Sequence, residues 1–192
     1  SHIALLHVNE TNGRACVIES HIECGVAVAS LDQYLQDKKL RLMVLRLRAD
    51  LPALQADPLL PHRAATRVLD EARRRHIPYD FAMNHHDHRA QFCSEVAAAA
   101  YEPFGLRLWM GLSFVSSPTI RAWLASLGVL HFETQEPADL EYDPQLRVVA
   151  EWRDPAALLK AHVDDATTDV LLESAEPGRA LAYDRWRLPL AR

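Results

Sequence analysis

The 192-residue sequence contains no long apolar run and only three cysteines, and both shortages restrict the class of protein. No stretch approaches the roughly 18 consecutive apolar residues of a membrane-spanning helix. The cysteines Cys16, Cys24 and Cys93 form no C-x-x-C pair. Neither a disulfide framework nor a thiolate zinc site is therefore predicted, and at least one thiol is expected to be free.

The sequence also has no excess of positive charge, no repeats and no low-complexity segment. The net charge of -5 argues against a nucleic-acid-binding surface. A hydrophobic fraction of 49% is sufficient for a packed core, and we expect one domain over residues 1–192. No charged-then-apolar leader opens the chain, so a signal peptide is not predicted, and the compartment and oligomeric state stay open.

Short apolar runs separated by turn residues predict a fold that begins with β-structure. Strands are expected at residues 3–8, 15–20, 25–29, 40–48 and 146–152, and helices at 65–72, 94–101 and 118–127. The first two strands should form a hairpin around residues 9–13. This pattern predicts an α+β fold with an antiparallel sheet or partial barrel of about five or six strands, packed against the helix that begins near Cys93.

Cys93 is the first candidate for chemistry because it lies at or just before a predicted helix N-terminus. Unpaired N–H groups and the helix dipole favour a thiolate at that position. The same N–H groups can donate to a developing oxyanion. A cysteine next to a run of alanines is also typical of a buried core position, so this placement alone permits a nucleophile without identifying one.

His2 and Glu19 are the candidate partners of Cys93. A cysteine nucleophile needs an imidazole base and a group that orients the imidazole. The predicted hairpin brings residues 2 and 19 to its open end, although two unrelated surface residues would fit the same pattern. His7 should face the opposite side of its strand and His21 has no counterpart in the motifs below, so both are weaker candidates for the base.

Four segments in order resemble the permuted NlpC-type papain-like enzymes called YiiX-like, distant relatives of lecithin:retinol acyltransferase. The segments are Ser1-His2-Ile3-Ala4, Val17-Ile18-Glu19-Ser20 with Gly25-Val26, Tyr79-Asp80-Phe81, and Phe92-Cys93-Ser94-Glu95-Val96. They span about residues 1–105. The order histidine, glutamate, cysteine marks the permutation, because ordinary papain-like chains present the cysteine first.

This resemblance implies a permuted papain-like domain with Cys93, His2 and Glu19 as the catalytic triad. Tyr79 and Ser94 become candidates for contact with substrate. The implied activity is cleavage of an amide bond through an acyl-enzyme, with no cofactor, on peptide-like substrates such as those of bacterial cell walls. Alternatives are an acyltransferase, thioesterase or lipase acting on lipid-like acyl substrates, and a non-catalytic binding or targeting module.

The histidine-rich segment His85, His86, Asp87 and His88 is the remaining conspicuous pattern. Adjacent histidines on an extended chain do not point at one centre, and no second cluster at ligand spacing accompanies them. A solvated loop bordering the cleft is therefore expected, with no metal site. Residues 106–192 contain no catalytic pattern, and their aromatic side chains are expected to pack in the core.

Overall fold

The computed structural model describes residues 1–36, 39–109 and 112–175, so residues 176–192 of the predicted domain lie outside the described part. Within the described residues, the strands are β1 (Leu5–Val8), β2 (Ala15–His21), β3 (Gly25–Ser30), β4 (Arg41–Leu47), β5 (Ser113–Phe114), β6 (Glu133–Thr134) and β7 (Leu146–Arg153). The α-helices are α1 (Leu31–Gln36), α2 (Pro52–Ala56), α3 (Leu60–Arg74), α4 (Cys93–Tyr101), α5 (Pro118–Ser126) and α6 (Pro155–Ala175). Two 3₁₀ helices are η1 (Glu102–Phe104) and η2 (Pro137–Tyr142).

The first sheet contains β1, β2 and β3 in that order, with antiparallel neighbours. Leu5 pairs with Ile18 and Val8 pairs with Ala15. The predicted hairpin around residues 9–13 is therefore confirmed. Because β2 is the central strand, its side chains on each face of the sheet are flanked by side chains of both neighbouring strands.

The other strands form two separate antiparallel pairs, β4 with β7 and β5 with β6. The predicted α+β class is confirmed. The strands are divided among three small sheets rather than joined in one sheet of five or six. The partner of β4 comes from far along the chain, since Arg41 pairs with Arg153. Local apolar patterns identify such strands but do not reveal which distant strand completes the pair.

Helix α4 lies between two hydrophobic clusters. The first cluster contains the buried residues Ile18, Val26, Ala64, Val68, Leu69, Ile77, Val96 and Ala100. The second cluster contains the buried residues Leu47, Leu60, Ala97, Leu106, Leu108, Trp109 and Leu140. Val96 and Ala100 are four residues apart and share one helix face, whereas Ala97 turns to the other cluster. The small side chains of α4 thus allow close packing on two sides.

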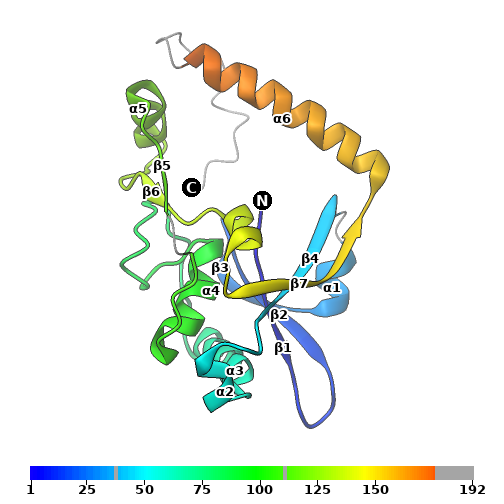
Figure 1. The fold of residues 1–192 in the computed structure, drawn as a ribbon. Helices are drawn as coiled ribbons and strands as arrows, with labels where there is room; N and C mark the ends of the chain where they lie inside the picture. The colour runs from blue at the N-terminus through cyan, green and yellow to red at the C-terminus, as the bar shows by residue number, and fades with distance from the viewer. Residues whose placement is uncertain (37–38, 110–111, 176–192) are drawn as a thin grey trace.

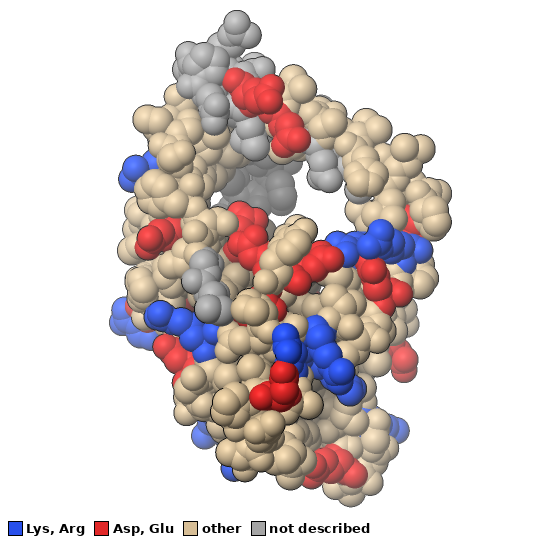
Figure 2. Space-filling model, viewed as in Figure 1, with Lys and Arg blue, Asp and Glu red and all other residues tan. Residues whose placement is uncertain are grey.

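Helix α6 follows β7 and crosses toward α5, away from the sheet of β1–β3 (Figure 1). Among the described residues, no helix combines the length and apolar character needed to cross a membrane. Acidic and basic side chains are interspersed over the face shown in Figure 2.

Gly25 occupies a position where backbone conformation and close packing both require glycine. Its φ is +70°, and a Cβ atom there would lie 2.9 Å from two backbone atoms of Pro78 and still closer to the Ile77 carbonyl oxygen. The Val26 N–H donates to that same carbonyl at 2.9 Å. The start of β3 therefore anchors the chain just before Tyr79.

We expect Gly25→Ala to lower the free energy of unfolding more than Gly13→Ala, which is a matched control. Gly13 has a φ of +67°, but a Cβ atom added to it would have nothing within 4 Å. Each variant should lose about 1–3 kcal/mol from the left-handed backbone conformation. The clash should cost Gly25→Ala a further amount of about 1 kcal/mol or more. Urea unfolding measures both losses, and equal losses would contradict the close approach to Ile77.

Candidate active site

Cys93 is the first residue of α4, as the sequence predicts for an activated thiol. The preceding Phe92 is extended, and its backbone N–H donates to Glu95 Oε2 at 2.9 Å. This contact stabilises the first helical turn, because the Glu95 carboxylate satisfies an N–H group at the helix start. The Cys93 side chain is half-buried rather than enclosed in the core. The thiol therefore lies at a helix N-terminus that substrate can approach.

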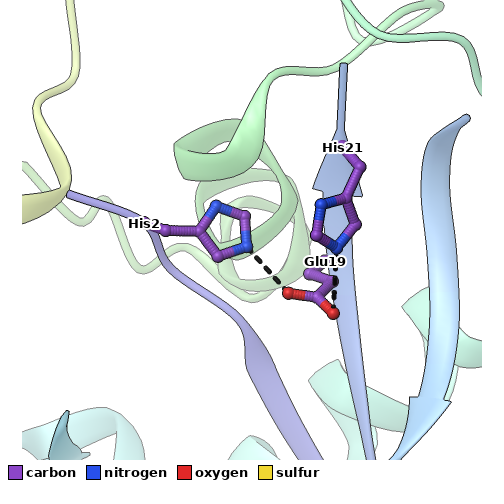
Figure 3. Close-up of side chains that lie close together, drawn as sticks. All are labelled: His2, Glu19 and His21. Carbon is purple, nitrogen blue, oxygen red and sulfur yellow. Dashed lines mark hydrogen bonds and ion pairs between the residues drawn. The ribbon is translucent and has the colours of Figure 1, made fainter. Parts of the chain in front are cut away.

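His2 and Glu19 meet at the open end of the β1–β2 hairpin (Figure 3). His2 precedes β1 and is not part of the strand. Its Nε2 atom lies 2.8 Å from Glu19 Oε2. The Glu19 residue is only 5% exposed, whereas the His2 side chain is 36% exposed. The carboxylate is thus shielded from solvent while the imidazole stays accessible.

His21 is a second histidine partner of Glu19. Its Nε2 atom lies 3.0 Å from Glu19 Oε1, and its ring stacks on that of His2 with centroids 5.3 Å apart. Glu19 and His21 are two residues apart on β2 and therefore project from the same face of the strand (Figure 3). Each carboxylate oxygen accordingly has its own imidazole. The sequence presents His21 only as a competitor of His2 and does not predict this shared contact.

The interaction between Cys93 and His2 stabilises the charged form of each side chain. Burial acts to raise the pKa of Cys93, but the hydrogen bond and charge of His2 lower it below the ordinary 9.0. The hydrogen bond with Cys93 raises the pKa of His2 above 6.5 and outweighs the effect of burial, and Glu19 adds to the rise. The Ile3 backbone N–H also donates to the sulfur and favours its charged form.

The two expected substrate residues occupy different environments. Tyr79 is half-buried beside the thiol, and burial, followed by the charge of Cys93, raises the pKa of Tyr79 to about 12. The phenol therefore stays protonated and can donate a hydrogen bond. Ser94 is fully buried, and its hydroxyl contributes to the lowered pKa of Cys93. Its side chain accordingly faces the thiol and the interior rather than solvent.

Two histidines of the histidine-rich segment, His85 and His88, lie near different acidic side chains. His88 Nδ1 lies 3.4 Å from the fully buried Glu95, and His88 Nε2 lies 3.1 Å from Glu102. The hydrogen bond with Glu95 raises the pKa of His88, while burial raises the pKa of Glu95. His88 thus pairs with the carboxylate that supports the start of α4. His85 instead lies near a different acidic side chain, Glu133.

His7, Cys16 and Cys24, the alternatives to His2 and Cys93, have different surroundings from those two residues. His7 is 7% exposed, and its Nε2 atom lies 3.2 Å from Thr66 Oγ1 on α3. Burial raises the pKa of Cys16, while Cys24 is exposed. Cys16, Cys24 and Cys93 are all free thiols, as the sparse cysteine pattern predicts.

The group around Glu19 also has the composition of a metal site. One ligand atom from each of His2, Glu19 and His21 lies within 4.8 Å of the other two. Two imidazoles and a carboxylate are common zinc ligands. An ion there would replace the direct contacts of Glu19 with His2 and His21.

Comparison with known proteins places the chain in a family. The family described as "Permuted papain-like amidase enzyme, YaeF/YiiX, C92 family" matches residues 1–150, which extends past the sequence motifs that end near residue 105. The crystal structure of the metalloprotein yiiX from Escherichia coli O157:H7 is similar, with a TM-score of 0.58 and 23% identity over 80% of this chain and 84% of that chain. No curated protein sequence matches significantly. The chain therefore belongs to the permuted papain-like amidase family of YaeF and YiiX.

Proposed function

We propose that this protein is a cysteine amidase with Cys93 as nucleophile, His2 as its base and Glu19 as the group that orients His2. The observation that carries the proposal is the connected set of contacts from Cys93 through His2 to the buried Glu19. Membership of a papain-like amidase family supports the same reaction class. His21 holds the second oxygen of Glu19 and so limits rotation of the carboxylate.

The proposed reaction begins with transfer of the Cys93 proton to His2. The thiolate attacks the carbonyl carbon of the amide and forms a tetrahedral intermediate. His2 then gives the proton to the departing amine as the C–N bond breaks, which leaves an acyl group on Cys93. Water, deprotonated by His2, attacks the thioester, and the acid and the free thiol are released.

The N-terminus of α4 supplies the environment for the charged states of this reaction. Cys93 is the first helical residue, so backbone N–H groups of the first turn lack partners within the helix. We assign these donors to the developing oxyanion, for which a preorganised N–H is worth about 3–4 kcal/mol in comparable hydrolases. The Tyr79 phenol, protonated and close to Cys93, is the proposed contact for the polar part of the substrate.

The proposed substrates are small peptides of the cell-wall type, with γ-glutamyl or diamino-acid amide linkages. Partly exposed imidazoles at His2 and His21 surround the site with groups that can bind carboxylates. The side chains of Ile22 and Phe81 are apolar and exposed. Ile22 follows His21 in the sequence, and the ring of Phe81 lies 5.0 Å from that of Tyr79, centroid to centroid. These exposed apolar side chains favour a second candidate function, the cleavage or transfer of a lipid-like acyl ester, because an acyl chain needs an apolar entrance.

We expect Cys93 to react with iodoacetamide faster than Cys16 or Cys24 at neutral pH. The lowered pKa increases the thiolate fraction about tenfold for each unit of the shift. The midpoint of the pH profile for Cys93 labelling should lie below pH 9.0. His2→Ala and Glu19→Gln should each move this midpoint to higher pH. Peptide-level mass spectrometry across a pH series gives the rate at every cysteine.

Cys24 provides an internal control, because its thiol is exposed and remote substitutions should leave its labelling unchanged. A Cys93 profile that is the same in wild type and in His2→Ala would remove the basis for assigning His2 as the base. Preferential labelling of Cys24 over Cys93 at neutral pH would count against an activated thiol.

We expect wild-type protein to release amine from γ-glutamyl and diamino-acid peptide amides. Cys93→Ala should lower kcat/KM by about 10³-fold or more, and His2→Ala by about 10²–10⁴-fold, since the two groups act in the same step. Acid quenching followed by intact-mass measurement should reveal the acyl group on wild-type protein. Cys24→Ala is the matched control and should retain wild-type activity.

The matched ester and thioester of each peptide, together with long-chain acyl esters, distinguish the candidate activities. Faster turnover of long-chain acyl esters than of any amide would replace the amidase proposal with the lipid-acyl alternative. Rapid Cys93 labelling without turnover or acyl-enzyme on any of these compounds would favour the binding or targeting module.

A further inference from the structure

A second group of potential ligands lies outside the proposed catalytic residues. One ligand atom from each of His85, His86 and Glu133 lies within 4.8 Å of the other two. We propose that these three side chains bind a divalent transition-metal ion, for which Zn²⁺ is the best chemical match. The sequence predicts a solvated loop here because adjacent histidines on an extended chain do not point at one centre, and the approach of Glu133 is not visible in any local pattern.

Backbone hydrogen bonds hold the two segments of this site together. The Ala82 carbonyl accepts from the Leu130 N–H at 3.1 Å and from the His131 N–H at 3.0 Å. Ala82 is three residues before His85, and Glu133 begins β6 shortly after His131. The ligands therefore come from two chain segments that are already joined without the ion.

The two adjacent histidines are arranged differently from those of an extended chain. Their rings are tilted by 43° with centroids only 4.0 Å apart. Both can therefore reach Glu133. His86 and Glu133 are exposed, so their side chains can rotate. Bond lengths of about 2.0–2.2 Å to zinc would bring the ligand atoms to about 3.3 Å from one another, which requires only a small movement.

His85 provides the second, independent indication of a ligand. Its Nδ1 atom is buried and has no hydrogen-bond partner. A buried polar atom without a partner is costly, and an ion bound through Nδ1 would satisfy its lone pair.

The contrast with His2, Glu19 and His21 favours this second site for the ion. Glu19 already pairs one oxygen with each histidine there, so an ion would have to displace two existing contacts. At the proposed site, binding through His85 Nδ1 would satisfy an atom that has no hydrogen-bond partner. Two imidazoles and one carboxylate leave a fourth position for water, since zinc prefers four ligands.

An ion at this site would link the loop before α4 to the β5–β6 pair. The base of the loop is closed by the Gln91 N–H, which donates to the Pro78 carbonyl at 2.9 Å. Tyr79 begins the same loop and lies close enough to Cys93 for the thiolate charge to affect its pKa. The ion would therefore restrict a loop that borders the candidate active site.

The test is zinc binding by the full chain after treatment with a chelator. We expect one zinc per chain after gel filtration, measured by mass spectrometry of the metal, and a higher midpoint of thermal unfolding with ZnCl₂. His86→Ala and Glu133→Gln should each weaken zinc binding more than about tenfold, a loss that even indirect partners of a ligand cause. Both residues are exposed, so the variants should keep the wild-type circular dichroism spectrum.

His76→Ala is the matched control, because His76 is an exposed histidine outside both groups, and it should bind zinc like wild type. Loss of zinc binding in His21→Ala together with full binding in His86→Ala would place the ion at Glu19 and overturn the proposal. Failure of wild type to retain zinc after gel filtration would also overturn it. These outcomes do not depend on amidase activity.

Discussion

The burial of α4 between two hydrophobic clusters is the constraint on which the site depends. Val96 and Ala100 pack toward the β1–β3 sheet and α3, while Ala97 packs toward β4 and η2. A helix held on two sides cannot shift along its axis without opening one cluster. Its first residue, Cys93, is therefore placed relative to β2 with little freedom. Larger side chains in the alanine run would overpack one cluster, typically at a cost of about 1–3 kcal/mol.

The local parts of the site could be predicted from the sequence. The hairpin that brings His2 to Glu19 follows from two apolar runs separated by turn residues, and the helix start at Cys93 follows from the residues after it. The motif order histidine, glutamate, cysteine led to the family that residues 1–150 match. These features depend on contacts between near neighbours or on a recognised pattern, so periodicity and spacing were sufficient.

Contacts between distant segments were not predictable in the same way. The pairing of β4 with β7 joins strands from opposite parts of the chain, and apolar alternation does not encode a distant partner. His85 and Glu133 are far apart in the sequence and lie near each other where the loop and the segment before β6 share backbone hydrogen bonds. The division of the histidine-rich segment, with His88 turned to the buried Glu95, depends on helix packing that no local pattern reveals.

The contact between Ile3 and Cys93 couples the ionisation of the sulfur to the order of the chain before β1. The Ile3 side chain packs against the second cluster, while its N–H donates to the sulfur. A charged acceptor binds an N–H more strongly than a neutral one. By thermodynamic linkage, docking of residues 1–4 promotes the thiolate, and the thiolate in turn favours the docked arrangement of these residues. The order of the segment that holds His2 and the ionisation of Cys93 are thus coupled.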